Sequence, residues 1–405
     1  MGNTKSGKIS GFAMPAVLVI SVLVMTVTAM AISLVTLDGK AYQEYCKGKQ
    51  RILDLESALA VYRYDSSMFH TADSSYIVLY DEDSEIRISR KPWGLYEYVS
   101  VSDRYENTVG RLYGRESDSC HEAAFWLCDR NRALTLDTGA VIDGPVYVPP
   151  NGINYSGEDT ALMSVRAYPA KVSSAELPRV EDDFNERIQK VFMSGDETTM
   201  KYTGSRIHRC FSSGPSVIMA SRKDSVFMLS GMTVLHGEDI VISGKSEMHD
   251  VIICAEKVTV RSGFRGCIQI FSRDSVTVES GAKLEWPSGI CVTTHSGFPY
   301  VELHKGCSVS GYVAVIGAEP DMELRYPGYV QQEKAKLNGL LYADCSCDIE
   351  GDITGAAYVR DCFHIEDGIK YPGTISSASI TRDDKLAFPV LMEGRYARKP
   401  IKRLL

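Results

Sequence analysis

Residues able to do acid–base or metal chemistry are spread along the 405-residue chain, and few of them lie close together in sequence. The one compact group, residues 364–367, reads His-Ile-Glu-Asp. In a β-strand alternate side chains point to opposite faces, so this group would be split between two faces. A zinc site needs His or Cys pairs at ligand spacing, and the Cys120-His121 pair is not mirrored by a second one. We therefore expect no metal site and no cofactor.

Carboxylates that cleave polysaccharides must converge on one face of the fold. The acidic residues in the second half of the chain are single and irregularly spaced, and basic residues lie among them. They include Asp239, Asp250, Asp274, Glu279 and Glu285, together with Lys257, Arg261 and Arg273. The phosphate-binding pattern GxxxxGK(S/T) and the nucleophile pattern GxSxG are absent from the sequence. We expect no enzymatic activity.

The chain has eleven cysteines, an odd number, so at least one stays unpaired within a monomer. Cys120 and Cys128 are close in sequence around a predicted turn and are the best candidates for a local disulfide bond. Cys254, Cys267 and Cys291 lie in strand-like runs. We expect these three to be small apolar side chains that fill the inside of a repeat domain.

Aromatic side chains offer another kind of binding, because rings on one outward face of a domain can stack on sugars. Trp286, Phe298 and Tyr300 are candidates for such a glycan-binding surface. The alternative is that these rings pack against the loops of the coils that carry them. The sequence leaves both interpretations open.

These residues all follow an apolar N-terminal segment that decides where they lie in the cell. Residues 12–37 carry no charge, and as a helix they would span about 39 Å, more than the roughly 30 Å hydrocarbon core of a bilayer. Lys5 and Lys8 precede the segment, which favours a cytoplasmic N-terminus and an exported body. A cleaved secretory signal ending near residues 29–31 (Ala-Met-Ala) is the alternative, although its apolar region is usually only about 7 to 15 residues.

The boundary between the leader and this segment carries a more specific pattern. Residues 8–12, Lys-Ile-Ser-Gly-Phe, form a short basic leader ending in Gly, followed by Phe and the apolar run. This pattern resembles the N-terminus of type IV pilins and pseudopilins. The resemblance implies cleavage between Gly11 and Phe12 by a prepilin peptidase and packing of the helix into a filament. In this family the fifth residue of the mature chain is usually Glu, and here it is Ala16. By this resemblance the missing Glu favours a tip, initiating or accessory subunit.

The segment after the apolar run predicts a stalk and then a small sheet. Residues 38–64 contain no proline, and Ile52, Leu55, Leu59 and Tyr62 form an amphipathic helical stripe. Short β-like runs within residues 65–130 then predict an antiparallel meander. These runs are residues 76–80, 85–89, 95–101 and 107–113. A long helix followed by a meander resembles the pilin layout, and a plain stalk leading into an unrelated β-domain is the alternative.

Residues 131–370 predict a right-handed parallel β-helix or solenoid, with a helical insertion at about 149–214. The phrase Val-x-Val followed by Gly recurs, and the closing glycines at 244, 263, 281 and 306 are 19, 18 and 25 residues apart. Stacked coils of this length bury one continuous apolar column. Within the insertion, residues 181–193 form a charged helical stretch with one apolar face. An antiparallel sandwich is the rival fold, but it gives no reason for the repeated phrase.

Residues 371–405 form an extension that ends in a basic tail. Its cations are Arg395, Arg398, Lys399, Lys402 and Arg403. The tail contacts anionic lipid headgroups or an acidic partner in one interpretation, and is a solvated, frayed terminus in the other. The net charge of −8 is spread along the chain, so we expect no nucleic-acid partner.

Taken together, the sequence predicts a mainly β protein on a long N-terminal transmembrane helix. We expect a single-pass protein of the cytoplasmic (inner) membrane, N-terminus inside, with its body extracytoplasmic or in a surface filament. Its partners would be the lipid bilayer, through residues 12–37, and other pilin-like subunits, whereas its ligand is unknown. The expected function is structural or binding, in assembly or adhesion at the cell envelope. A membrane-anchored β-helix protein that binds or cleaves polysaccharide is the alternative.

Overall fold

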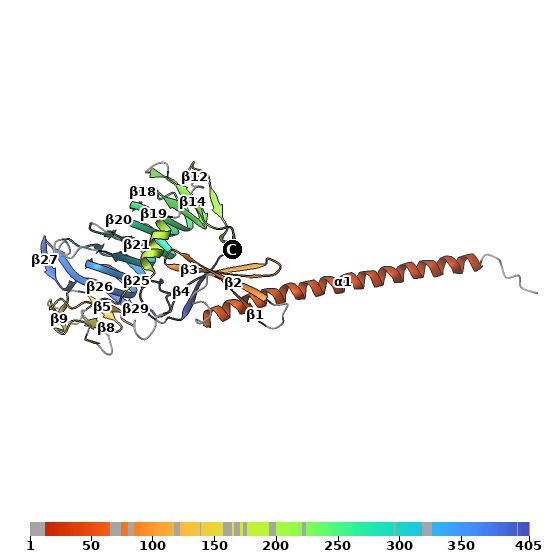
Figure 1. Ribbon diagram of the computed structural model, residues 1–405, viewed down its shortest axis with the longest axis horizontal. Coiled ribbons are helices and arrows are strands. Elements are labelled where there is room, and N and C mark those ends of the chain that lie inside the picture. The colour runs from red at the N-terminus through yellow and green to blue at the C-terminus, as the bar shows by residue number, and fades with distance from the viewer. Residues whose placement is uncertain are drawn as a thin grey trace, which may run out of the picture.

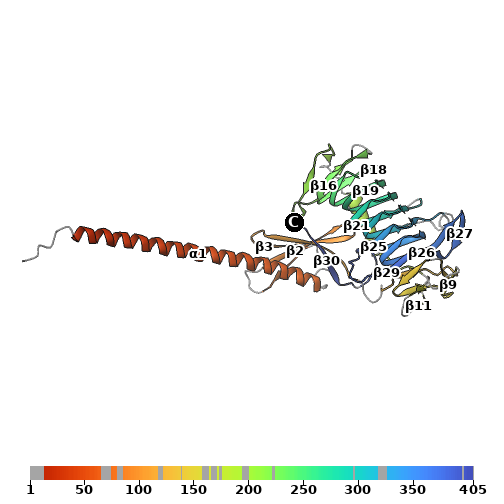
Figure 2. The same cartoon turned by 180° about the vertical axis from the view of Figure 1, so that it is seen from behind.

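The computed structural model consists of a long helix attached to a β-rich body (Figures 1 and 2). It describes residues 13–64, 74–79, 85–116, 122–137, 139–156, 164–165, 171–172, 176–193, 200–220, 224–294, 297–317, 326–394 and 396–404. The helix, a small sheet and a solenoid follow one another along the molecule, as the sequence predicts.

Helix α1 (Ala13–Tyr64) has 52 residues and is therefore about 78 Å long. Its only proline, Pro15, lies in the first turn, where the missing N–H costs no helical hydrogen bond. Hydroxyls in its apolar part donate to carbonyl oxygens of the preceding turn, as Ser21 does to Leu18 at 2.9 Å. The helix thus satisfies its own polar groups, which a membrane-spanning segment must do.

The predicted antiparallel meander follows α1, and it has one strand more than expected. Its first four strands are β1 (Ser74–Val78), β2 (Glu85–Trp93), β3 (Tyr96–Asp103) and β4 (Thr108–Arg115). The fifth is β30 (Arg398–Leu404), which comes from the end of the chain and pairs antiparallel with β4. The C-terminal segment, predicted as an extension, therefore completes the meander sheet.

Both faces of the meander are apolar, and each packs against a different partner. Val99 and Val101 belong to the core under α1, whereas Tyr96 and Tyr98 belong to the core between the meander and the solenoid. Gly110 leaves room for the second layer, because a Cβ there would lie 2.3 Å from the Tyr98 hydroxyl oxygen. The meander is thus a layer between the helix and the rest of the body (Figure 1).

The solenoid is built from parallel strands, so the antiparallel sandwich is wrong. The predicted phrases stack in register: Ile240 lies beside Val258, Val258 beside Val276, and Val276 beside Val301. These four side chains lie in the interior cluster of the solenoid. Gly263 closes its phrase with a φ of 83°, which a residue with a Cβ rarely adopts.

Long strands form the central coils, and short strands form the coils at both ends. The long strands are β19 (Glu247–Val260), β20 (Arg265–Val278), β21 (Lys283–Thr293), β23 (Ser308–Ile316), β25 (Lys336–Ile349) and β26 (Asp352–Glu366). The short strands beside or before them are β12 (Met200–Lys201), β13 (Ile207–Arg209), β14 (Ser216–Met219), β15 (Asp224–Ser225), β16 (Met228–Gly231), β17 (Thr233–His236), β18 (Asp239–Ile242), β22 (Tyr300–Leu303) and β24 (Tyr329–Gln331).

One outer face of the solenoid is covered by the meander, and the solenoid strands at this face are apolar on both sides. The runs at residues 312–315, 340–343 and 356–359 stack in register and are buried on both sides. Strands buried on both faces lose the polar alternation of a half-exposed sheet. At one corner of these coils Gly339 approaches the coil before it so closely that a Cβ would lie 1.7 Å from the Gly311 carbonyl oxygen.

The coils do not follow the order of the sequence, which the repeat pattern did not predict. The described strands between residues 125 and 172 come before the central coils in the chain but stack beyond the last of them, where β5 (Phe125–Leu127) pairs in parallel with β26. The other strands of this end are β6 (Leu134–Leu136), β7 (Val141–Asp143), β8 (Val146–Val148), β9 (Ile153–Tyr155), β10 (Ser164–Val165), β11 (Lys171–Val172), β27 (Ile369–Pro372), β28 (Thr374–Ile375) and β29 (Ser379–Arg382).

The predicted insertion at about 149–214 is too long, because strands β9 to β13 belong to the coils at the two ends of the solenoid. The segment between β11 and β12 connects these ends. Its described part holds helix α2 (Phe184–Phe192), as the charged helical stretch predicts. Phe184 and Ile188 are buried in the same cluster as the outer face of the solenoid. The Tyr342 hydroxyl donates to the Pro178 carbonyl at 2.9 Å, which ties the segment before α2 to a central coil.

Candidate functional site

The last turns of α1 are buried against the meander and form the hydrophobic part of a docking site. Leu55, Leu59 and Tyr62 are at most 1% exposed, as the predicted stripe requires, and Ala58 is buried with them. Ile52, the first residue of that stripe, is 52% exposed. The hydrophobic core under α1 therefore begins one turn later than the sequence predicts, at Leu55, whereas Arg51 contacts the meander through the Tyr105 ring, 4.1 Å from its centroid.

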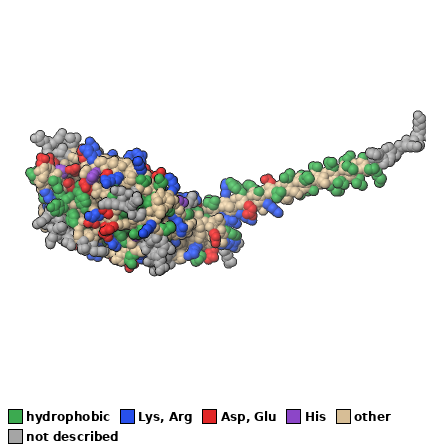
Figure 3. Space-filling view, turned by 90° about the horizontal axis from the view of Figure 1, so that it is seen from above, with side chains coloured by type: hydrophobic (Ala, Val, Ile, Leu, Met, Phe, Trp, Pro, Cys, Tyr) green, Lys and Arg blue, Asp and Glu red, His purple; other side chains and the backbone are tan. Residues whose placement is uncertain are grey.

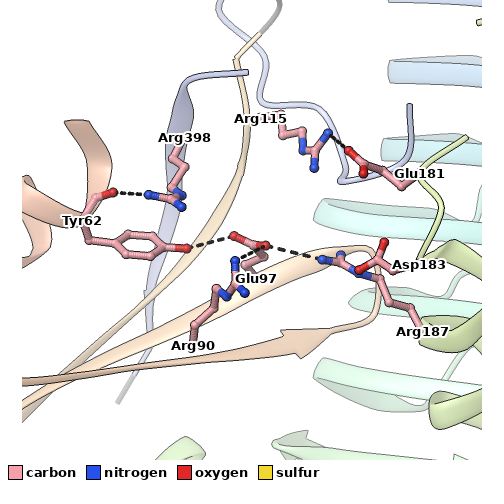
Figure 4. Close-up of polar contacts among 8 residues, drawn as sticks. All are labelled: Tyr62, Arg90, Glu97, Arg115, Glu181, Asp183, Arg187 and Arg398. Carbon is pink, nitrogen blue, oxygen red and sulfur yellow. Dashed lines mark hydrogen bonds and ion pairs between the residues drawn. The ribbon is translucent and has the colours of Figure 1, made fainter. Parts of the chain in front are cut away.

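A polar clamp closes this docking site at the end of the helix (Figure 4). The Tyr62 hydroxyl donates to the Glu97 carboxylate at 2.9 Å, and the Arg398 guanidinium donates to the Tyr62 carbonyl at 2.6 Å. Arg398 also lies over the Tyr62 ring, 4.1 Å from its centroid. A cation on the last carbonyls of a helix is favourable because those groups carry partial negative charge. The C-terminal strand thus holds the end of the N-terminal helix.

Glu97 connects this clamp to the insertion. Its carboxylate lies 3.5 Å from the Arg187 guanidinium of α2 and 3.9 Å from that of Arg90 on β2 (Figure 4). Arg187 also contacts Asp183 at 2.8 Å. The Glu97 and Arg187 side chains are 12% and 14% exposed, so water screens the pair only partly. Helix, meander and insertion therefore meet at one carboxylate.

Three further ion pairs flank the clamp. Glu56 on α1 contacts Arg111 of β4 at 2.5 Å and Arg403 of β30 at 3.8 Å. Arg115 at the end of β4 pairs with Glu181 just before α2 (Figure 4). These contacts join the same three parts of the chain as Glu97 does.

Most of the predicted basic tail is engaged inside the protein. Besides Arg398 and Arg403, Lys402 contacts the Asp250 carboxylate at 2.8 Å, and Lys399 donates to the Asp384 carbonyl at 2.8 Å. These four cations belong to a paired strand and lie against internal partners, because β30 is held between α1 and the solenoid. Arg395 lies outside the described residues.

The other end of α1 is bare. In the 18-residue window that qualifies it as a candidate membrane span, mean hydropathy is 2.5 and none of the residues is buried. Figure 3 shows hydrophobic side chains around the far part of the helix and charged ones nearer the body. The protein therefore has one N-terminal helix long and apolar enough to cross a membrane. Gly11 and Phe12, the predicted processing site, lie outside the described residues.

No family model, curated protein or solved structure matches this chain. The resemblance of residues 8–12 to pilins stays a prediction. The functional argument therefore depends on the geometry of α1 and its docking site.

The three aromatic residues predicted to bind glycans lie in β21, in β22 and just before β22. Trp286 in β21 is partly buried and packs edge-to-face against Tyr96 of the meander, with ring centroids 6.4 Å apart. Tyr300 begins β22, and burial together with the nearby Glu302 carboxylate raises the pKa of its hydroxyl. Phe298 is partly buried just before β22. Trp286 thus contributes to packing, and glycan binding stays a prediction.

The predicted cysteine fillers are buried, but all three lie outside the interior core of the coils, and Cys267 lies beside the Asp250 carboxylate and the meander. Cys254 and Cys291 belong to the cluster between the solenoid and its cover, since the meander and α2 make that face as dry as the interior. Burial raises the pKa of the Cys267 thiol to about 12, which makes it a poor nucleophile at neutral pH. Cys120 lies outside the described residues, so its pairing with Cys128 stays a prediction.

The structure also assembles one cluster that the sequence analysis missed. His364 lies beside Asp348 and Glu350, which belong to the preceding coil. Burial and the Glu350 charge raise the pKa of the Asp348 carboxyl to about 6. The spacing of the coils could have predicted this cluster. Cys347 and Cys362 are neighbours in the parallel register of β25 and β26, which places His364 beside residues 348–350. Glu366, its neighbour in the compact sequence group, is exposed.

Proposed function

We propose that this protein is a membrane-anchored structural subunit of the cell envelope. Residues 12–37 hold it in the cytoplasmic membrane, or in a pilus-like filament after processing, and the body is exported. Its role is assembly or adhesion, without catalysis. The observation that carries this proposal is the contrast within α1, whose apolar half is fully exposed and whose last turns are buried in the body.

The exposed half of α1 calls for an apolar environment. Val19, Leu23 and Met30 are each at least 60% exposed, and the neighbouring residues are similar. Contiguous apolar surface of this size on a soluble protein marks a membrane or protein contact. Lipid chains would cover the helix in a bilayer, and like helices would cover it in a filament.

The clamp at the other end supports a structural role. A subunit that transmits force from its anchor to its body needs a joint stronger than a flexible linker. Here α1 enters the body as one continuous helix, and side chains from β2, β4, β30 and α2 hold its end or the carboxylate that it contacts. The pilin-like leader and the accessory-subunit pattern of Ala16 agree with this role.

The mature N-terminus tests the filament form of the proposal. Processing by a prepilin peptidase predicts Phe12 as the first residue, measured by mass spectrometry of the protein isolated from its native membranes. Replacing Gly11 with Val should leave the leader uncut, because the peptidase reads the Gly before the cleaved bond. Gly7→Val is the matched control and should be processed normally.

The possible outcomes separate the two forms of anchoring. An intact Met1 contradicts the filament form but leaves a membrane anchor. A protein that begins at Ile32 contradicts both forms, since cleavage after Ala31 removes most of the apolar segment.

A further inference from the structure

The end of the solenoid farthest from the free end of α1 carries a cluster of metal-ligating side chains. Asp348 lies near the end of β25, Glu350 follows that strand, and His364 lies near the end of β26. Strands β26 and β27 are found at this far end of the body (Figures 1 and 2). Pairing with β25 stops at Cys362, and β26 then forms an antiparallel hairpin with β27 that includes His364.

The distances in this cluster do not fit direct hydrogen bonds. The His364 Nδ1 atom lies 3.7 Å from an Asp348 carboxylate oxygen and 3.5 Å from a Glu350 carboxylate oxygen. Hydrogen bonds between such groups are usually about 2.7 to 3.2 Å long. Two ligands of a tetrahedral zinc ion are about 3.4 Å apart, because each bond to the metal is about 2.1 Å. The two distances from Nδ1 are close to this value, and all three potential ligand atoms lie within 4.8 Å of one another.

Two of these atoms also lack a hydrogen-bond partner. Within the described part of the chain, Asp348 Oδ1 and His364 Nδ1 are inaccessible to solvent and accept or donate no hydrogen bond. Their side chains are 13% and 12% exposed. Buried polar atoms are nearly always satisfied by protein, water or an ion, and one ion between the three side chains would satisfy both atoms.

We propose that Asp348, Glu350 and His364 bind one divalent transition-metal ion of the zinc class. One imidazole nitrogen and two carboxylate oxygens suit Zn²⁺, Co²⁺ or Ni²⁺, whereas Mg²⁺ and Ca²⁺ prefer oxygen ligands alone. Three protein ligands leave one tetrahedral position for water. The ion joins a coil to the terminal hairpin, because Asp348 and Glu350 come from the coil of β25 and His364 comes from the hairpin of β26 and β27.

Binding of Zn²⁺ alone to the full-length protein in detergent tests this site. Competition against a chromophoric chelator should give one Zn²⁺ per chain at this site, and the same titration with Mg²⁺ should give none. His364→Ala and Asp348→Asn should each weaken binding at least about tenfold, since each removes a ligand. Bound Co²⁺ should show the intense visible absorption of a four-coordinate site, which those variants lose.

His304→Ala is the matched control. The His304 Nε2 atom lies 3.3 Å from a Glu302 carboxylate oxygen. Among the described residues this pair is not part of a group of three potential metal ligands, so the loss of His304 should leave Zn²⁺ binding unchanged. Circular dichroism verifies that each variant is folded. If His364→Ala does not fold, Glu350→Gln tests the site instead. The Glu350 side chain is 31% exposed, so its substitution should disturb the fold less. Unchanged Zn²⁺ affinity in a folded His364→Ala or Glu350→Gln protein, or no binding to the parent protein, overturns the proposal.

Discussion

Both ends of helix α1 carry apolar side chains, but the protein covers only one of them. Residues 14–37 are exposed all round, whereas Leu55, Ala58, Leu59 and Tyr62 are buried under the meander. The free end is apolar on every side, and the docked end is apolar on one stripe only. A helix that is apolar all round needs an apolar surrounding, and a striped one needs a single flat partner. This difference assigns the first half to lipid or helices and the second half to the body.

Loss of Tyr62 should weaken the docked end most. Its side chain is fully buried, its ring packs edge-to-face on Tyr113 at 5.2 Å, and its hydroxyl is bonded to Glu97. We expect Tyr62→Ala to lower the free energy of unfolding by about 3 to 5 kcal/mol. Urea unfolding of the full-length protein in detergent, followed by tryptophan fluorescence, measures this change.

The control lies two residues away on the same helix. Tyr64 is 78% exposed, so Tyr64→Ala should change the free energy of unfolding by no more than about 0.5 kcal/mol. Equal effects of the two variants would show that the end of α1 is not docked as described.

Substitution of Glu97 or Glu56 should lower the free energy of unfolding by less than Tyr62→Ala does, and by different amounts. Glu97→Gln keeps a hydrogen bond to Tyr62 but removes the charge facing Arg187, and we expect a loss of about 1 to 3 kcal/mol. Glu56→Gln should cost at most about 1 kcal/mol, because its pair with Arg111 is about 30% exposed on both sides and screened by salt.

Urea unfolding at low and high salt distinguishes them. The cost of Glu56→Gln should shrink at high salt, whereas most of the cost of Glu97→Gln should remain. A Glu97→Gln protein as stable as its parent would mean that Glu97 does not join helix and insertion.

The sequence was informative where a pattern is local. The uncharged run at residues 12–37, the stripe from Leu55 to Tyr62 and the Val-x-Val phrases each depend on neighbouring residues, and each predicted its element. The prediction that Ile52 is buried was wrong, because helical periodicity does not show where along α1 the contact with the meander begins.

Features that join distant parts of the chain were not predictable in this way. Arg398 reads as a cation in a basic tail, and only the pairing of β30 with β4 brings it onto Tyr62. Residues 131–148 read as the start of the solenoid, yet their strands lie at its other end, since parallel strands can pair in any chain order. His364 meets Asp348 for the same reason, because its partners belong to another coil.

Membrane fractionation tests most directly whether the free end of α1 is the anchor. Val19→Lys together with Val22→Lys places two charges at mid-span, each costing about 2.5 to 3.5 kcal/mol in a bilayer. The matched control is Tyr42→Lys with Tyr45→Lys, which has the same spacing on the exposed, charged part of the helix. We predict that the first double variant leaves the membrane fraction or is not exported and that the second remains bound. Equal membrane association of both variants would contradict the account.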